Sequence, residues 1–183
     1  MQALFAKYKS VIKFILTFVL VYAVLSVAYK LYLDYSDSSI YYPDYITNLT
    51  AKQSESLLDS FGYDTSVEAH TDEPSMKLII NGKYVARVIE GCNSISVIIL
   101  FVSFVIAFAG RLQPTIIYLL AGSVLIYAVN LFRIVILSIG LFHYPWRRDI
   151  LHNIIFPLII YGMVFLLWMV WVNRFATLKK QDA

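Results

Sequence analysis

The sequence contains a single cysteine and few charged residues. Only 15% of its 183 residues are charged and 60% are hydrophobic, whereas soluble domains have about 25% charged and about 45–50% apolar residues. A lone cysteine cannot form an internal disulfide, so Cys92 is either a free thiol or apolar packing. Three scattered histidines and one cysteine lack the spacing of metal ligands, so we expect no metal and no cofactor. The net charge of +3 is too small to indicate a nucleic-acid partner.

The hydrophobic residues gather in four long runs, which predict a multi-pass integral membrane protein. We expect membrane spans at residues 11–33, 93–109, 115–144 and 151–172. A cleaved signal peptide is the alternative for the first run. The apolar region of a signal peptide has only about 7–15 residues before a small-residue cleavage site, and no such site follows here. We therefore predict a retained helix and an all-α, four-helix transmembrane bundle.

A polar segment, Asp34–Glu90, separates the first two spans and contains ten of the twelve acidic residues against four basic ones. Apolar residues near helical spacing over Tyr45–Phe61 predict an amphipathic helix. Asn81-Gly82, between two runs of strand-forming residues, predicts a two-residue β-hairpin. We therefore expect a small α+β cap between the first two membrane helices.

The positions of lysine and arginine near the spans predict the orientation. They occur before the first span, at Arg111 between the second and third spans, and after the last span, so we place both ends of the chain in the cytoplasm and the cap outside. Arg147 and Arg148 lie outside against this rule, which we interpret as pairing with acids of the cap or with an acidic substrate motif. The expected division is residues 1–33 (N-terminus and first span), 34–90 (extracytoplasmic cap), 91–173 (three-helix transmembrane core) and 174–183 (cytoplasmic tail).

Three reactive side chains are predicted to meet at one depth. Cys92 precedes the second span and His152 begins the fourth, both on the outer side. Arg133 is 18 residues into the third span, which places it ~27 Å from the cytoplasmic side of a hydrocarbon core that is ~30 Å thick. An imidazole can take a proton from a thiol, and a guanidinium can stabilise a thiolate or an oxyanion.

Several neighbouring residues are candidates for supporting roles. Asn130 shares a helix face with Arg133 and either orients it or donates to an oxyanion. Asn93 is a candidate N-cap of the second span, whose positive end would favour the thiolate. Glu90 either holds an outer arginine or competes with substrate for Arg133. His143 is the rival of His152 as the base.

Each of these residues also has an ordinary structural explanation. A lone cysteine is often apolar packing, an arginine near the end of a span can extend to the headgroups, and a histidine can simply begin a helix. Their convergence at one depth is what favours an active site.

At these residues the chain resembles the exosortase/archaeosortase family of membrane cysteine transpeptidases. The resemblance rests on Glu90-Gly-Cys-Asn93, then Asn130-Leu-Phe-Arg-Ile134, then His152 at the start of a helix, and covers roughly residues 89–162. The short length and the cap look most like the compact F-type exosortases of Bacteroidota. Two features depart from the family: Ser94 stands where the family often has glycine, and larger relatives have about twice as many spans.

The resemblance implies Cys92 as nucleophile, His152 as acid and base, and Arg133 as the third catalytic residue. The implied substrates are secreted proteins with a C-terminal sorting signal, cut through a thioester at the outer face of a bacterial inner membrane. Arg147 and Arg148 are candidates for binding that signal, and an oligomer or an accessory membrane protein is a possible further partner. The alternatives are a non-catalytic scaffold that binds a partner through its cap, and a thiol-dependent acyltransferase.

Overall fold

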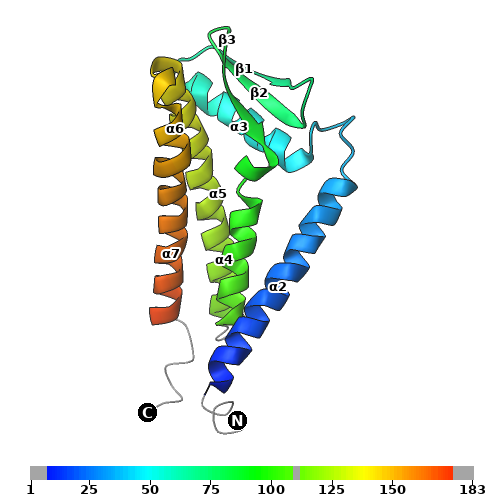
Figure 1. Ribbon diagram of the computed structural model, residues 1–183, viewed down its shortest axis with the longest axis vertical. Helices are drawn as coiled ribbons and strands as arrows, with labels where there is room; N and C mark the ends of the chain where they lie inside the picture. Colours follow the sequence, from blue (N-terminus) through cyan, green and yellow to red (C-terminus); the bar gives the residue numbers. More distant parts are fainter. Residues whose placement is uncertain (1–7, 109–111, 175–183) are drawn as a thin grey trace.

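A computed structural model describes residues 8–108 and 112–174 of the chain. Apolar helices stand side by side, and a short helix and a small sheet lie across one end of them (Figure 1). The main helices are α2 (Lys9–Asp34), α3 (Tyr45–Ser60), α4 (Ile95–Ala107), α5 (Leu112–His143) and α7 (Phe156–Arg174). The sheet consists of β1 (Thr65–Ala69), β2 (Ser75–Ile80) and β3 (Lys83–Ile89). The short turns are η1 (Glu90–Cys92), η2 (Pro145–Arg147), α6 (Arg148–Ile150) and the π-helical η3 (Leu151–Ile155).

Among the residues that the structure describes, three helical segments are long and apolar enough to cross a membrane: Lys9–Asp34, Leu112–His143 and Pro145–Arg174. They agree with three of the four predicted spans. The remaining prediction, residues 93–109, corresponds to α4, which has 13 residues and a length of ~20 Å. That is shorter than a ~30 Å hydrocarbon core, so the four-span bundle is supported for three spans only.

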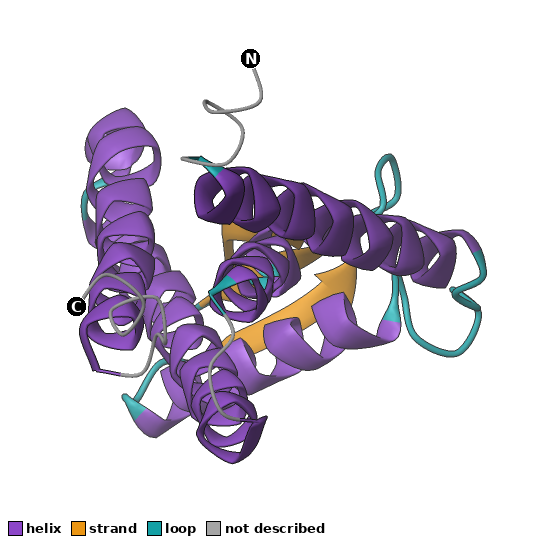
Figure 2. Cartoon of the chain, turned by 90° about the horizontal axis from the view of Figure 1, so that it is seen from below, coloured by secondary structure: helices purple, strands orange, loops and turns teal. Residues whose placement is uncertain are grey.

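The core of the helical part lies between α4, α5 and α7. Its fully buried side chains are Phe101 and Val105 of α4, Ile126 of α5, and Val164 and Trp171 of α7. Helix α4 also packs along α2. Figure 2, which looks from the end opposite the sheet, shows the helices gathered in front of the strands.

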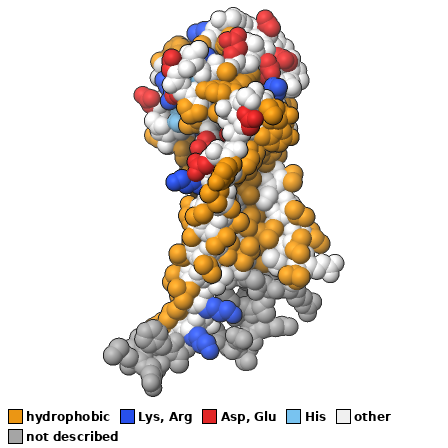
Figure 3. All heavy atoms as spheres, turned by 90° about the vertical axis from the view of Figure 1, so that its right-hand side faces the viewer, with side chains coloured by type: hydrophobic (Ala, Val, Ile, Leu, Met, Phe, Trp, Pro, Cys, Tyr) orange, Lys and Arg blue, Asp and Glu red, His pale blue; other side chains and the backbone are white. Residues whose placement is uncertain are grey.

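The exposed surface changes character along the molecule. Figure 3 shows apolar side chains covering the helices on the visible face, and acidic side chains gathered over the sheet and α3. A broad apolar belt with charges at the ends is what a bilayer requires, because the hydrocarbon core offers no partner for charged groups. The chain is therefore a membrane protein.

The predicted hairpin is confirmed. Strands β2 and β3 pair antiparallel, with Ile80 opposite Lys83. Asn81 and Gly82 both have positive φ, 49° and 74°, as a two-residue turn of this type requires. Strand β1, which pairs antiparallel with β2, was not predicted.

Helix α3 agrees with the predicted amphipathic helix, but its buried face is more polar than expected. Thr47, Thr50 and Ser54 are fully buried, whereas Phe61, just after the helix, is 59% exposed. The small side chains let α3 fit closely between the sheet and α5. Their hydroxyls remain satisfied because Thr50 and Ser54 donate to carbonyls one turn earlier.

Candidate active site

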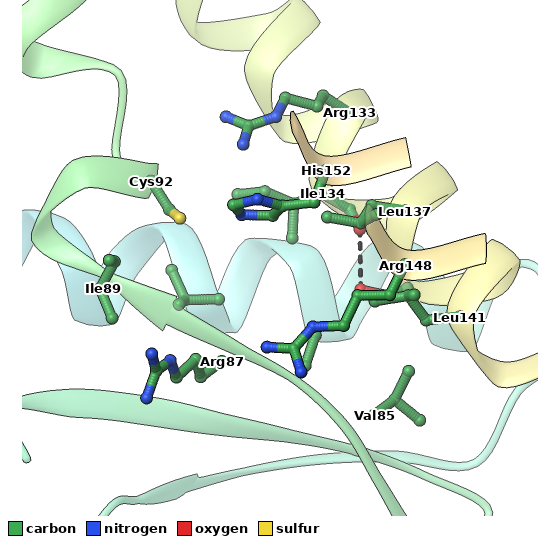
Figure 4. A pocket seen from close by; sticks show the side chains of 13 residues that line it. Val85, Arg87, Ile89, Cys92, Arg133, Ile134, Leu137, Leu141, Arg148 and His152 are labelled. Atoms are coloured by element: carbon green, nitrogen blue, oxygen red, sulfur yellow. Dashed lines mark hydrogen bonds between the residues drawn. The ribbon is translucent and has the colours of Figure 1, made fainter. Parts of the chain in front are cut away.

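A cavity of about 150 Å³ lies where β3, η1, α5 and η3 meet. Its walls include Cys92, Arg133 and His152, three residues that the sequence places in separate segments. Figure 4 shows the Cys92 sulfur and the His152 ring facing one another across the cavity, with the Arg133 guanidinium on one side of them. The three predicted catalytic residues therefore share one site.

Cys92 ends the 3-10 turn η1, which continues from the end of β3. The thiol is partly buried. Because it belongs to neither the strand nor α4, its position depends on contacts made by the residues around it. Cys92 packs against an apolar cluster that contains Val88 and Ile134, and two buried asparagines, Asn93 and Asn130, supply polar contacts beside it.

Asn130 connects the nucleophile segment to the arginine. Its Nδ2 donates to the backbone carbonyl of Cys92 at 2.6 Å, and its Oδ1 accepts from Nη1 of Arg133 at 3.0 Å. Asn130 is 2% exposed, so its amide group has little contact with water. This geometry fits the orienting role, because the amide oxygen of Asn130 accepts from the Arg133 guanidinium. One N–H of its NH2 group binds the Cys92 carbonyl, and the second has no hydrogen-bond partner among the described residues.

Asn93 joins three segments at the base of the cap. Its Nδ2 donates to the Tyr29 hydroxyl of α2 at 2.8 Å and to Thr47 of α3 at 3.2 Å, and its Oδ1 accepts from the backbone N–H of Ile95 at 3.1 Å. The N-cap position of α4 itself belongs to Ser94, not to Asn93 as predicted. The Asn93 side chain nevertheless satisfies a free N–H of the first helical turn.

Ser94 adopts a left-handed conformation with φ of 66°. Glycine tolerates this conformation best, and another residue there costs roughly 1–2 kcal/mol. Glycine is the residue best suited to this turn between η1 and α4, and Ser94 adopts its φ under mild strain. Its hydroxyl donates to the carbonyl of Asn93 at 2.6 Å.

His152 lies in the π-helical turn η3, and its Nδ1 is 3.1 Å from Oδ1 of Asn153. In the tautomer with Nδ1 protonated, the ring donates to this amide oxygen and Nε2 has a free lone pair. A base oriented in this way can take a proton from a thiol. Asn153 carries no signal in the sequence, because an asparagine next to a histidine is too common to indicate a role.

The rival histidine lies elsewhere. Nε2 of His143 is 3.1 Å from the Tyr63 hydroxyl, and the residue does not line the cavity. The geometry therefore favours His152 over His143.

The two outer arginines have different surroundings. Arg148 lines the cavity together with Cys92 and His152. Arg147 instead places its guanidinium 5.6 Å from the centre of the Tyr144 ring and does not line the cavity. The expected pairing with acids of the cap does not occur within residues 8–108 and 112–174, where Glu73 forms the ion pairs of the cap.

Glu90 has an exposed carboxylate. Across the described part of the chain it forms an ion pair neither with Arg133 nor with another arginine. Neither role expected for Glu90 is therefore visible in the geometry.

A second cavity, of about 540 Å³, adjoins the first. The two share Val85, Ala86, Arg87, Leu141 and Arg148. Arg87 donates to Glu73 and holds the pKa of that carboxyl below its ordinary value. The shared walls form one continuous depression that leads away from Cys92 along the cap.

This arrangement supplies the parts of a thiol-based acyl transfer. A cysteine faces an oriented imidazole, an arginine held by Asn130 lies beside them, and an adjoining cavity offers room for a bound chain. Comparison with protein families finds that the model of transmembrane exosortases matches residues 8–174, which includes the cap and the helices from α2 to α7. Comparisons with curated proteins and with solved structures found no match.

Proposed function

The chain belongs to the transmembrane exosortase family, and on this premise we propose that it is a cysteine transpeptidase that cleaves C-terminal sorting signals of secreted proteins. The observation that carries the proposal is the single cavity that contains Cys92, Arg133 and His152. A scaffold that only bound a partner through its cap would have no need to bring these side chains together.

In the proposed reaction, Nε2 of His152 takes the thiol proton and the Cys92 sulfur attacks the carbonyl carbon of the scissile peptide bond. The negative charge that develops on the carbonyl oxygen is stabilised by the Arg133 guanidinium. The C–N bond then breaks, His152 returns the proton to the leaving amine, and a thioester remains on Cys92. An acceptor amine or water attacks the thioester, the C–S bond breaks, and the thiol is restored.

The proposed placement has both ends of the chain in the cytoplasm and the cavity at the outer face of a bacterial inner membrane. The distribution of lysine and arginine supports this orientation. In the same arrangement α4 and the three longer helices form the transmembrane part, residues 34–90 form the cap, and the catalytic core extends over residues 91–173. Membership of the F-type group stays a prediction, as does an oligomer or an accessory membrane protein.

Replacement of the nucleophile and the base tests the proposal. The measurement is the apparent size of secreted proteins that end in an apolar span and a basic tail, in cells with matched enzyme levels. We expect Cys92→Ala to abolish processing and His152→Ala to slow it by roughly 10²–10⁴-fold, the contribution of a general acid–base group. His143→Ala is the matched control and should process normally.

Asn153 separates orientation of the base from its chemistry. Asn153→Asp keeps an acceptor for Nδ1 of His152 and should retain activity. Asn153→Ala should lower the processing rate about tenfold, since a barrier raised by about 1.4 kcal/mol through lost alignment corresponds to that factor.

Unchanged processing by Cys92→Ala would refute the proposal. Transfer of a lipid acyl group to Cys92 without any cut protein would favour the acyltransferase alternative.

A further inference from the structure

Strand β3 forms one edge of the sheet, and its outer edge has no partner. The strand order is β1-β2-β3, so β3 pairs with β2 alone. An edge strand presents a row of unpaired N–H and C=O groups to its surroundings. In the described ranges no side chain or backbone group bonds to this outer edge of β3.

The opposite edge of the sheet is protected. On β1, the backbone N–H groups of Thr65 and Val67 donate to the carboxylates of Asp59 and Glu55, which extend from α3. Side chains that occupy an edge in this way prevent another strand from adding to it. The contrast indicates that only the β3 edge is available for pairing.

The free edge of β3 borders both cavities. Five consecutive residues, 85–89, line the cavity that contains Cys92, and residues 83–87 line the adjoining one. Successive side chains of a strand point to opposite faces of the sheet. Residues of both orientations line the two cavities, and Val85 is the extra residue of a β-bulge between the Leu78–Ala86 and Ile79–Tyr84 pairs, so the cavities extend along the length of β3.

The bottom and the far wall of this depression are formed by α5 and by the segment that follows it. Leu137 and Leu141 of α5 pack against Val85 and Ala86 at the bottom of the depression, and Arg148 and His152 lie across it from β3 (Figure 4). Cys92 lies three residues beyond the end of β3, at one end of the depression. A chain bound along β3 would thus be led to the thiol.

The shape and the charge of the depression fit an extended peptide. The basic residues in the walls of the two cavities are His70, Lys83, Arg87, Arg133, Arg148 and His152, and no acidic residue lines either cavity. Such walls favour peptide carbonyls and disfavour basic segments. An α-helix, with a diameter of about 10–12 Å, is poorly matched to a strand edge, whereas an extended chain pairs at about 4.8 Å.

We propose that the substrate segment preceding the cleaved bond binds as a fourth strand on the free edge of β3, parallel to it. This rests on the proposed function. Strand β3 runs from the far end of the cap toward Cys92 and the helices (Figure 1). A substrate with its folded part outside and its apolar span in the bilayer runs in the same direction, so the added strand is parallel.

Backbone pairing of this kind binds a peptide independently of its side chains, and specificity comes from contacts between alternate side chains and the walls of the depression. The distance from Tyr84 to Ile89 is five residues, which corresponds to ~16 Å of strand. The enzyme would therefore bind about five substrate residues in extended form before the cleaved bond.

Disulfide cross-linking tests this register. Cys92→Ala removes the only cysteine, so single cysteines can be placed in that background by Ile89→Cys or Tyr84→Cys. The probe is a panel of secreted reporters. Each reporter ends in the C-terminal segment of a host protein, consisting of an apolar span and a basic tail. Each carries one cysteine, at a different position among the ten residues before the span. We expect Ile89→Cys to trap reporter cysteines nearest the span and Tyr84→Cys to trap those about five residues earlier.

The control is Ser66→Cys in the same background, which places an exposed cysteine on β1 at the protected edge and should trap none. Cleavage of the same reporters by the wild-type enzyme is scored separately. Cleavage without ordered cross-links to β3, or cross-links in the reverse order, would overturn the parallel strand but leave the catalytic proposal intact. Ordered cross-links without cleavage would support the strand and refute the chemistry, and the absence of both across the panel would refute both.

Discussion

At the scale of single residues, the site is organised by side chains that do not react. Asn130 holds the Cys92 carbonyl and the Arg133 guanidinium at once, and it is buried. Buried polar groups are costly unless every one is paired, so this pair of bonds has few alternative arrangements. The thiol-bearing turn and the cation thereby keep a fixed relation although they belong to different segments.

Asn130→Asp removes one of these two hydrogen bonds and keeps the other. The carboxylate still accepts from Arg133 but has no N–H for the Cys92 carbonyl, and an unpaired buried acceptor costs about 1–3 kcal/mol. If that free energy is lost from the transition state, processing falls roughly 5–150-fold. The measurement is the rate of reporter cleavage at matched levels of folded enzyme.

Asn48→Asp is the control for this change. Asn48 is buried and its Nδ2 donates to the carbonyl of Tyr42 at 2.9 Å, so the same atom is lost from the same kind of bond away from the cavity. It should lower stability and leave the rate per folded molecule unchanged. Equal losses of rate in both variants would show that Asn130 has no special relation to the thiol.

At the scale of elements, the position of α4 depends on close contact with α5. A Cβ atom on Gly122 of α5 would lie 2.3 Å from Cζ of Phe101 in α4. The Phe101 side chain is fully buried. Small residues at such crossings let membrane helices approach closely. Since α4 begins just after Cys92, this contact also determines where the nucleophile turn is anchored.

Gly122→Ala should therefore displace α4 and destabilise the protein by about 1–3 kcal/mol, as overpacking does in dense cores. The measurement is the midpoint of thermal unfolding in detergent, together with reporter cleavage. Phe101→Leu in the same chain should recover part of the loss by making room for the methyl group. Gly162→Ala in α7, where an added Cβ meets nothing within 4 Å, is the matched control, and an equal loss there would contradict this explanation.

At the scale of the whole molecule, one helix connects the two parts of the protein. Helix α5 has 32 residues, a length of ~48 Å, which exceeds a ~30 Å hydrocarbon core. Its later turns pack under the sheet, where Val135 contacts the cluster of Leu58, Leu78 and Ile80. The helix that carries Arg133 thus also supports the cap. The cavity lies where the later turns of α5 approach the sheet.

Labelling of the single thiol tests the proposed orientation. In spheroplasts, a membrane-impermeant maleimide should modify Cys92 without permeabilisation, because the cavity faces outward in the proposed arrangement. Ser10→Cys in the Cys92→Ala background places an exposed thiol at the start of α2, at the other end of the molecule. It should react only after permeabilisation, and the reverse pattern would invert the proposed topology.

The sequence by itself determined three of the four expected apolar spans, the hairpin at Asn81-Gly82 and the convergence of Cys92, Arg133 and His152. These features depend on local periodicity and on the fixed rise of a helix, both of which can be calculated from residue positions alone. Strand β1 escaped prediction because its five residues, TSVEA, carry a weak signal and are stabilised by pairing with β2 and by carboxylates of α3.

Only the tertiary structure decided which neighbours face the cavity. Arg148 lines it and Arg147 does not, although adjacent positions look equivalent in sequence. One N–H of Asn130 binds a backbone carbonyl, and the side chain in contact with the His152 ring is that of Asn153. The physical reason is that the rotation of each helix and the path of each turn are fixed by packing between segments far apart in the chain. A periodic pattern gives the depth of a residue, but contact with other elements determines the direction of its side chain.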